Sequence, residues 1–519
     1  MEIYSGGFIT ALMVSAAIIW YFTKSRKNKG DPVNWPVVGM LPSLLWNLSN
    51  VYEWAAGIVI RNGGTFAFKG PLGSKHFFEI VTSSAPNLEY ILKDDFANFP
   101  RGPSFKSIFF DIFGDGLFVA DGELWKRQRT AVAIAMSSTT FRDQNINQTQ
   151  GLVLERLIPV LEESCKKNSS LDIQDILLRL NFDNICLALS GKDAGFLLPD
   201  LPEVPFAVAF EQAIESSTYR LIIPSFVSKV MQFFNVGFER KHRRAMGIIL
   251  EYASELVRFK MAELEKMSNE KRGQCGDILS TFIHQERVDG RSPSLKSVRD
   301  LCLSIILAAR DTSSLALSWF FWLLNQHPDV ETKIMSELYE ILKAKFSNNP
   351  YDINTLRFSH DDLKGMQYLR AALSEAMRLY PPVPVSYRQA VRDVILPDGT
   401  RVKKGSKLLY LIYATNRMEN LWGKECREFR PERWINRNGI CMKESDYKYP
   451  VFNAGPRLCL GREMAYVSMK CLAAHVLLRY RVRIYPGHPV QPKFGLTLFM
   501  RHGLKVTLQP RDNAVLQKN

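Results

Sequence analysis

The apolar positions of the chain follow three different spacings. From about Pro86 to Leu379 they recur every three or four residues, which is the spacing of one face of an amphipathic helix. The longest such runs occupy 140–163, 243–267 and 298–326. Strand-like stretches occupy 65–68, 77–82 and 394–413. This pattern predicts a mainly α protein with small β-sheets.

The third spacing is an almost unbroken apolar run, Ile3 to Phe22, followed at once by the basic segment Lys24 to Lys29. The run is about as long as a bilayer is thick, so we predict an N-terminal transmembrane helix with the rest of the chain on the cytosolic side. A cleaved signal peptide is the weaker alternative, because the chain starts with Met1 and Glu2 and offers no small-x-small cleavage site. A buried core helix is the other alternative.

The chain therefore divides into an N-terminal membrane anchor at 1–23, a basic and proline-containing linker at 24–42, and one domain at 43–519. The linker carries Pro32, Pro36 and Pro42, which stiffen it. No second linker divides the remaining residues, so we expect a single domain.

Charge and cysteine content exclude several classes of protein. The net charge is +15, but the basic residues are spread along the chain, and no RNA-binding or DNA-binding module is visible. We therefore expect no nucleic acid partner; an anionic membrane or an acidic protein fits the charge better. The eight cysteines include no C-x-x-C pair, so a zinc module and a disulfide scaffold do not fit.

One cysteine, Cys459, lies in a loop with unusual surroundings. A lone cysteine is usually a small buried apolar residue. Here Gly455, Pro456 and Gly461 shape a tight turn, and a predicted helix from about Leu460 to Leu478 directs its positive end at the sulfur. These features favour a thiolate that binds a metal.

The loop resembles the haem-binding loop of the cytochrome P450 superfamily. Its pattern, F-x-x-G-x-R-x-C-x-G, is filled by Phe452, Gly455, Arg457, Cys459 and Gly461. The resemblance implies a single-domain cytochrome P450 fold at 43–519 and a haem b cofactor. Cys459 would be the axial thiolate ligand of the haem iron.

Three further motifs strengthen this resemblance. Glu375 and Arg378 lie three residues apart on one predicted helix, and Arg433 follows in the segment FRPERW. They resemble the Glu-Arg-Arg network of the family, which would fix the segment that leads to the cysteine loop. An ordinary surface salt bridge is the alternative for these residues taken alone.

The third motif, 306–314, lies in the longest apolar helix and resembles the oxygen-binding groove of the family. An acid in a core helix is normally costly, and a threonine there normally bonds back to a carbonyl one turn earlier. The resemblance implies that Thr312 hydrogen-bonds bound oxygen or a water, and that Asp311 connects that water to bulk protons. Ala309 stands where the family usually has glycine, so the resemblance does not determine the width of the groove.

A fourth motif, W-x-x-x-R, contains Trp125 and Arg129. The resemblance implies that both residues and Arg457 pair with the haem propionates, and that Arg388 contributes in the same way. Lys126 and Arg127 would then lie on the proximal face. That face would receive an acidic partner, the NADPH-cytochrome P450 reductase.

The resemblance covers the whole chain beyond the anchor and implies a haem-thiolate monooxygenase of the endoplasmic reticulum membrane. It would use O2 and electrons from NADPH to hydroxylate a small hydrophobic substrate. Within the superfamily the chain is most similar to the plant fatty-acid ω-hydroxylases and mid-chain alkane hydroxylases. This similarity rests on NWPVVGMLP (34–42), TFAFKGP (65–71), SWFFWLLNQHP (318–328), WGKECREFRPERW (422–434) and MRHGLKV (500–506).

These marks favour a long-chain fatty acid or an alkane as substrate. We expect the pocket to be lined by apolar residues, with Lys106 as a candidate partner for a carboxylate. The expected lining residues are Phe105, Phe109, Phe110, Phe113, Val383, Val385, Leu498 and Phe499.

Three other functions remain open at this point. A related plant group couples two phenol rings of norbelladine-type alkaloids to make noroxomaritidine, and it would differ only in the pocket. A haem-thiolate isomerase or dehydratase needs no proton relay, so the Asp311-Thr312 pair disfavours it. A non-catalytic haem protein or membrane-tethered interaction protein would have no use for all four motifs.

Overall fold

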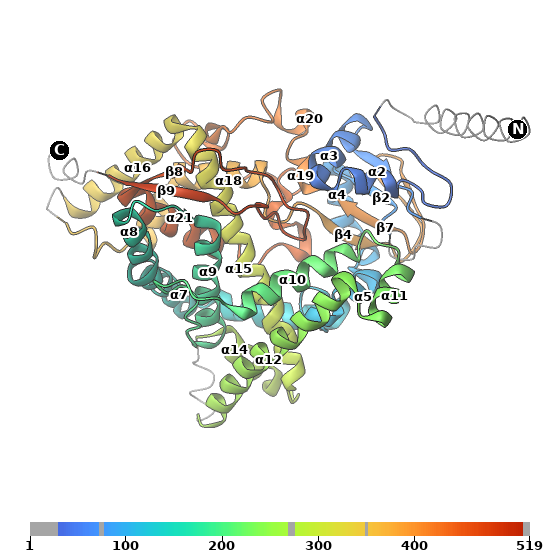
Figure 1. Ribbon diagram of the computed structural model, residues 1–519, viewed down its shortest axis with the longest axis horizontal. Helices are drawn as coiled ribbons and strands as arrows, with labels where there is room; N and C mark the ends of the chain where they lie inside the picture. The colour runs from blue at the N-terminus through green and yellow to red at the C-terminus, as the bar shows by residue number, and fades with distance from the viewer. Residues whose placement is uncertain (1–29, 72–76, 268–275, 348–350, 512–519) are drawn as a thin grey trace, which may run out of the picture.

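The computed structural model describes residues 30–71, 77–267, 276–347 and 351–511. Most helices gather around one long helix, α15 (Leu295–Gln326), which crosses the middle of the molecule (Figure 1). The predicted membrane anchor at 1–23 lies outside the described residues.

The helices and strands are as follows. The α-helices are α2 (Leu41–Trp46), α3 (Val51–Arg61), α4 (Ala85–Glu89), α5 (Gly102–Phe113), α6 (Gly122–Ser137), α7 (Thr139–Leu152), α8 (Ile158–Lys166), α9 (Ile173–Ser190), α10 (Pro205–Tyr219), α11 (Ser225–Phe234), α12 (Gly237–Glu265), α14 (Ile278–Val288), α15, α16 (Pro328–Phe346), α17 (His360–Gly365), α18 (Gln367–Leu379), α19 (Ile412–Thr415), α20 (Glu419–Trp422) and α21 (Arg462–Arg479). Short 3-10 or π turns are η1 (Leu48–Asn50), η2 (Tyr90–Asp94), η3 (Phe96–Asn98), η4 (Val153–Leu157), η5 (Pro431–Trp434), η6 (Pro450–Phe452) and η7 (Gly455–Arg457). The strands are β1 (Thr65–Ala67), β2 (Ile80–Thr82), β3 (Leu171–Asp172), β4 (Ser386–Gln389), β5 (Val394–Ile395), β6 (Arg401–Val402), β7 (Lys407–Tyr410), β8 (Tyr480–Ile484) and β9 (Lys505–Pro510).

The strands form three small sheets at the edges of the helical body. The four-stranded sheet has the order β1-β2-β7-β4, in which only β2 and β7 are parallel, with Ile80 opposite Leu408. The three-stranded sheet has the order β3-β9-β8 and joins Leu171 to Val506. The third sheet is the hairpin of β5 and β6. The prediction of a mainly α fold with small sheets is therefore confirmed.

Helix α15 is the axis of the apolar core. Its first half packs in one cluster with α5, α9, α10, α12 and α14, and its second half packs in another with α16, α18, α21 and the β8-β9 pair. The helix is long and apolar enough to cross a membrane, yet 78% of its most apolar window is buried inside the protein, so it serves as a core helix. Each fully buried Leu, Ile or Phe contributes about 1.5–3 kcal/mol to this core.

Two predicted elements differ from the structure. The run 140–163 is interrupted by the π turn η4, because Pro159 in the first turn of α8 has no N–H and cannot continue the α-helical ladder. The stretch 394–413 holds only short strands, and its end turns into α19. Strands β8 and β9 were not predicted, because each is stabilised by a partner distant in sequence.

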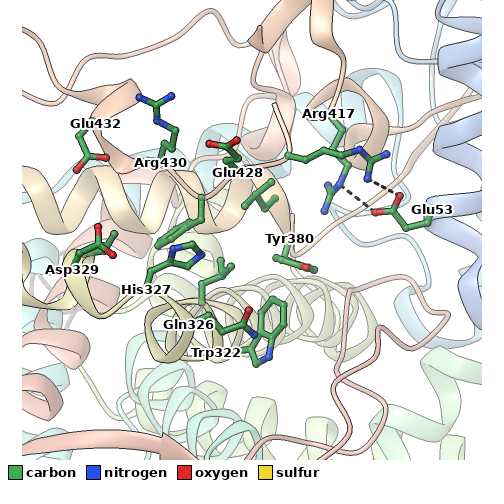
Figure 2. A pocket seen from close by; sticks show the side chains of 15 residues that line it. Glu53, Trp322, Gln326, His327, Asp329, Tyr380, Arg417, Glu428, Arg430 and Glu432 are labelled. Carbon is green, nitrogen blue, oxygen red and sulfur yellow. Dashed lines mark hydrogen bonds and ion pairs between the residues drawn. The ribbon is translucent and has the colours of Figure 1, made fainter. Parts of the chain in front are cut away.

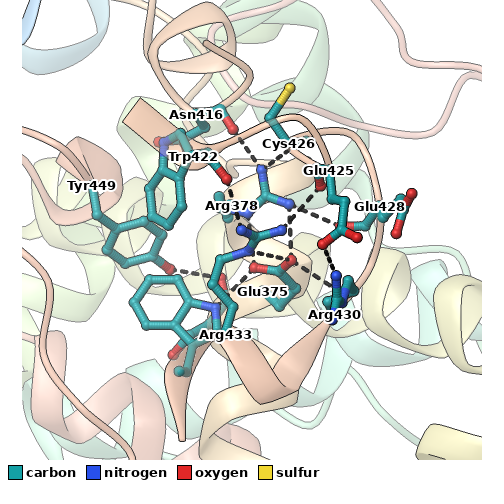
Figure 3. A network of polar contacts seen from close by, with 12 residues as sticks. Glu375, Arg378, Asn416, Trp422, Glu425, Cys426, Glu428, Arg430, Arg433 and Tyr449 are labelled. Atoms are coloured by element: carbon teal, nitrogen blue, oxygen red, sulfur yellow. Dashed lines mark hydrogen bonds and ion pairs between the residues drawn. The ribbon is translucent and has the colours of Figure 1, made fainter. Parts of the chain in front are cut away.

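A buried carboxylate, Glu375 on α18, fixes the segment that leads to Cys459 (Figure 3). Arg378 binds it with two nitrogens, Nε at 2.7 Å and Nη2 at 2.8 Å, and the Nε of Arg433 lies 3.4 Å away. The Nε1 of Trp434 and the backbone N–H of Arg430 also donate to Glu375. The predicted Glu-Arg-Arg network is therefore confirmed.

The two arginines of this network also donate to backbone carbonyls (Figure 3). Arg378 bonds to the carbonyls of Asn416, Cys426 and Glu428, and Arg433 bonds to those of Trp422 and Glu425. Loop carbonyls buried without such donors would each cost about 1–3 kcal/mol. The network therefore supplies hydrogen-bond donors to the carbonyls of the irregular chain between α19 and η5 and holds this chain in one conformation.

Candidate functional site

The cysteine loop is held by its own backbone and by one glycine. The N–H of Cys459 donates to the carbonyl of Phe452 at 2.8 Å, and the N–H of Leu458 donates to that of Gly455 at 3.0 Å. Gly455 has φ 62, and a Cβ placed there would lie 1.9 Å from the carbonyl oxygen of Leu92. Only glycine fits this turn, which sets the direction from which Cys459 leaves the loop.

The sulfur of Cys459 faces an interior opening. Cys459 is exposed, yet protein surrounds it closely enough that burial raises the pKa of its thiol. Its exposed surface is therefore closely surrounded by other parts of the protein. The backbone N–H of Gly461 and the charges of Arg129 and Arg462 lower the pKa but do not outweigh burial. The loop itself therefore lowers this pKa only in part, and a bound cation would favour the thiolate further.

A second wall of the cavity is an open face on α15. Between residues 300 and 321 every residue of this helix is buried except Ala308, Ala309 and Thr312. These three positions lie on one side of the helix. Ala309 and Leu460, the neighbour of Cys459, pack against the same apolar cluster. The open face and the residue that follows Cys459 therefore border the same apolar cluster.

Three arginines with buried, unpaired N–H groups lie near this region. Arg388 is fully buried and donates only from Nη1, to the carbonyl of Tyr387, so that its Nε and Nη2 have no partner. Arg457 donates from Nη2 to Asp121 and to the carbonyl of Ala120, but its Nε has no partner. Burial, together with the charge of Arg388, lowers the pKa of Arg457 to about 10.

Arg101, the third arginine of this group, was missed in the sequence. Its Nη1 bonds to the Oγ of Ser386 and to the carbonyl of Tyr387, while its Nε has no partner. Burial and the charge of Arg388 lower the pKa of Arg101 well below its usual value. An arginine directly before the Gly102-Pro103 start of an apolar helix was the available signal. Buried unpaired guanidinium donors are what a group with two carboxylates would satisfy, so Arg101, Arg388 and Arg457 fit the propionates of a haem.

Trp125 and Arg129 lie on α6 beside the cysteine loop. The guanidinium of Arg457 stacks on the ring of Trp125, 4.5 Å from its centroid. The Nη2 of Arg129 donates to the carbonyl of Leu458 at 2.7 Å. The structure therefore shows both residues holding the loop in place and lying close to Arg457 and Cys459. The predicted pairing of Trp125, Arg129 and Arg457 with haem propionates stays a prediction.

The neighbours Asp311 and Thr312 point to different partners. The Oγ1 of Thr312 donates to the carbonyl of Ala308 at 2.6 Å, the ordinary bond of a threonine within a helix. Asp311 is only 1% exposed and bonds to the Nη1 of Arg310 and the Oγ1 of Thr497, each at 3.3 Å. Burial raises the pKa of Asp311 to about 6, although Arg310 opposes the shift.

Two residues that the sequence did not suggest connect Asp311 with the surface. The Nη2 of Arg310 bonds to the Oε1 of Glu211 at 2.7 Å, and Glu211 is 42% exposed. Arg310 stood out in the sequence only as a charge next to Asp311 in an apolar helix. The three charged groups form a continuous chain from the core beside Thr312 to solvent.

One of the expected pocket residues on α5 lies on the outside of the protein. Phe110 is 41% exposed on the outer face of α5, so its placement in the pocket was wrong. Phe105, Phe109 and Phe113 are buried and pack on one another and on Phe118. Helix α5 therefore presents an aromatic layer to the core.

Lys106 is likewise directed away from the core. Its Nζ lies 2.5 Å from Asp115 and near the outward-facing ring of Phe110. Of the other expected lining residues, Val383, Val385 and Phe499 are partly exposed, while Leu498 is fully buried. Lys106 is therefore unsuited to hold a carboxylate inside the pocket.

Two surface cavities lie apart from this site. One, of about 620 Å³, is lined by residues of α3, α15, α16 and the segment 427–432 (Figure 2), where Glu53 already pairs with Arg417 and Arg427. The other, of about 570 Å³, is lined by residues of α6, α7, α18 and α21, including Leu460 and Met464. Neither is lined by Cys459, Arg388 or Thr312, so neither is the candidate active site.

Comparison with known proteins agrees with the geometry. A family model described as Cytochrome P450 matches residues 32–510. Cytochrome P450 86B1 of Arabidopsis thaliana is 44% identical over 507 residues, 97% of this chain and 89% of that protein. Alkane hydroxylase MAH1 of Arabidopsis thaliana is 34% identical over 514 residues, 97% of this chain and 98% of that protein. Noroxomaritidine synthase 1 of Narcissus pseudonarcissus is 34% identical over 491 residues, 94% of this chain and 93% of that protein.

Replacing the sulfur of Cys459 provides a direct test of the site. In Cys459→Ser we expect loss of the red-shifted Soret band of the reduced carbonyl complex, because that shift reports a thiolate ligand opposite the carbon monoxide. The absorption spectrum of the purified protein measures it. Cys441→Ser, a change at a partly exposed cysteine of the separate 570 Å³ cavity, should leave the band in place. An unchanged band in Cys459→Ser would exclude this residue as the iron ligand.

Proposed function

Because this chain belongs to the cytochrome P450 family, whose members are haem-thiolate monooxygenases, we propose that it hydroxylates a long-chain fatty acid or an alkane. The observation that carries the substrate class is the apolar character of the cavity borders. Ala308 and Ala309 form the open face of α15, and the aromatic layer of α5 packs in the same cluster. The only lysine of α5 pairs with Asp115 on the outside. A substrate held by apolar contact alone fits these borders best.

The haem, held by Cys459, supplies the chemistry that activates O2. Arg101, Arg388 and Arg457, with Trp125 and Arg129, would hold and orient it through its propionates and through the loop. We propose that NADPH-cytochrome P450 reductase delivers the electrons to the proximal face, where Lys126 is exposed. The protein would then contribute placement of the substrate, exclusion of water and a supply of protons.

Thr312 and Asp311 would provide the protons. The hydroxyl of Thr312 donates to Ala308, but its oxygen can still accept a bond from a water on the open face. Asp311, with a pKa of about 6, is mostly ionised at pH 7.5 and can still take up a proton. Glu211 and Arg310 link it to solvent, so that a proton lost to the cavity can be replaced.

The role of Thr312 can be tested with a matched variant. Thr312→Ala should keep the haem but lower kcat roughly 10²-fold, because the water that delivers the proton would lose the oxygen that positions it. More of the NADPH consumed should then end as hydrogen peroxide, which a peroxide assay run beside product analysis measures. Ser318→Ala removes a similar hydroxyl, which is bonded to the carbonyl of Ser314 on the buried side of the same helix. This variant should form as much product per NADPH consumed as the wild type. Equal coupling in Thr312→Ala and the wild type would exclude the role.

Oxidative coupling of a norbelladine-type alkaloid is the second candidate function. It has support because noroxomaritidine synthase 1 and alkane hydroxylase MAH1 are equally identical to this chain. The aromatic layer of α5 would also suit a phenolic ring. An isomerase or dehydratase has less support, because it would not use the connected charges of Asp311, Arg310 and Glu211.

Substrate-binding difference spectra distinguish these functions. We expect a high-spin shift with long-chain fatty acids or alkanes, because a substrate over the haem displaces water from the iron, and hydroxylated product when reductase and NADPH are added. Omission of the reductase is the control and should abolish turnover. A shift with the bis-phenolic precursor and none with the lipids would replace the first candidate by the second.

We also propose a single-pass attachment to the endoplasmic reticulum membrane. The apolar run at 3–22 supports it, and so do apolar side chains exposed on α11 and near the linker: Val37, Leu45, Trp46, Phe226, Val230, Phe233 and Phe234. A surface with this many exposed apolar side chains suits contact with lipid.

Deletion of residues 1–23 tests the attachment. We expect most of the truncated protein to leave the membrane fraction, because the anchor buries far more apolar surface than the exposed side chains of α11. Flotation with microsomes, followed by immunoblotting, measures the distribution. If the full-length protein were released by a mild salt wash, the proposed anchor would be wrong.

A further inference from the structure

The cavity of about 570 Å³ has no part in the proposed function. Phe452 and Leu460 of the cysteine loop line one side of it, and residues of α7, α18 and α21 line the others. Its volume lies within the range of roughly 300–1,000 Å³ that is typical of sites for small organic molecules. Neither Cys459 nor the open face of α15 belongs to its lining, so a molecule bound there would leave the iron free.

The lining of this cavity is both apolar and basic. Its apolar side chains include Met136, Phe141, Ile146, Leu460 and Met464. Six lysines and arginines also line it, against three acidic residues. Such a lining favours a ligand that is largely apolar and carries a negative charge.

Most of the basic residues of the cavity already have an acidic partner. Arg370 donates to Glu463 from two nitrogens, at 2.9 and 3.1 Å, and the Nη1 of Arg462 lies 3.0 Å from Asp446. Lys443 is 64% exposed and lies 3.9 Å from the same aspartate. Paired or solvated charges of this kind attract a further anion only weakly.

Lys470 on α21 is the exception. It is 3% exposed, and in the part of the chain that the structure describes its Nζ has one hydrogen-bond partner, the carbonyl of Leu363, and no carboxylate partner. The two acids that act on its charge are engaged elsewhere: Glu463 binds Arg370, and Glu337 accepts two backbone N–H groups of α18.

This ammonium group lacks a counter-ion inside the protein. Burial, together with the charge of Arg370, lowers the pKa of Lys470 to about 8. A buried cation without an anion destabilises the fold, and a bound anion would offset that cost. Since an ammonium has three N–H groups and Leu363 takes one, two remain for such an anion.

A second donor in the wall of the cavity is also unsatisfied. Asn145 on α7 lines the cavity, is 3% exposed, and its Nδ2 has no hydrogen-bond partner. Helices α7 and α21 pack on each other, so Asn145 and Lys470 come from two neighbouring helices. Val467, one turn before Lys470, lines the same cavity.

The depth of these donors favours a small ligand over a protein. A large acidic partner that rests on the rim would reach Lys443, but Lys470 and Asn145 are almost completely covered. Only a slender molecule can enter the cavity and bring its charge to Lys470.

We propose that this cavity is a second ligand site, separate from the substrate cavity, for an apolar monoanion such as a fatty-acid carboxylate. The charged group of the ligand binds Lys470, and its apolar part contacts the apolar lining. The site does not depend on which substrate the iron oxidises.

Binding of 8-anilinonaphthalene-1-sulfonate to the holoenzyme tests the site. This probe is an apolar sulfonate whose fluorescence rises in apolar surroundings. The iron is first saturated with clotrimazole, so that the substrate cavity is occupied, and the wild type should still bind the probe saturably. Lys470→Met keeps the length of the side chain but not its charge and should bind about tenfold more weakly, because a charged hydrogen bond is lost. Fluorescence titration measures both affinities.

Lys443→Met is the matched control for Lys470→Met. It removes a charge from the same cavity, but an exposed one, so the affinity should stay within about twofold of the wild type. Dodecanoate should displace the probe, and dodecanol, which has no charge, should not. Absence of saturable binding with clotrimazole in place, an unchanged affinity in Lys470→Met, or an equal loss in Lys443→Met would overturn the proposal.

A second variant tests the site without changing Lys470. Val467→Phe adds volume to the lining of the cavity and should also weaken binding of the probe, and an unchanged affinity would contradict the site. It provides the test if Lys470→Met fails to hold the haem, which the carbonyl spectrum shows. The titration needs neither substrate nor turnover. A failure of fatty acids and alkanes as substrates would therefore leave its result interpretable.

Discussion

The positive charge of Arg101, Arg388 and Arg457 is the constraint on which the rest of the structure depends. The three guanidinium groups come from the start of α5, from β4 and from η7, and together they lack acidic partners for several of their N–H groups. Buried cations are tolerated only when they are paired or bound to an anion. A haem with two propionates would neutralise this group, so binding of the cofactor would favour the packing of three distant segments.

The cysteine loop shows the same dependence on surroundings. Burial raises the pKa of the Cys459 thiol, while the N–H of Gly461 and the charges of Arg129 and Arg462 favour the thiolate. Arg378 and Arg433, which are bound by Glu375, hold the irregular chain before the loop by donating to carbonyls that would otherwise lack donors. The sulfur of Cys459 therefore favours a bound cation, and the arginine group favours a ligand with two negative charges. The protein itself supplies neither.

Helix α15 combines two roles that conflict in an ordinary core helix. It is the axis of both apolar clusters, yet it keeps Ala308, Ala309 and Thr312 open and buries Asp311 and Arg310 close by. Burying that ion pair costs stability, and its connection to Glu211 gives a reason for retaining it. Ala309 does not interrupt the helix, which runs unbroken from Leu295 to Gln326.

The sequence by itself determined the parts of the protein that depend on neighbours along the chain. Helical spacing, the glycine turn before Cys459 and the three-residue spacing of Glu375 and Arg378 are local patterns, and the structure bears them out. Arg101, Glu211 and Thr497 were not predicted. Each acquires its meaning from a partner on another element, brought near only when the helices pack. The positions of Lys106 and Phe110 were predicted wrongly for the same reason. Packing against α10, α12 and α15 decides which side of α5 faces the core, and periodicity alone does not identify those helices.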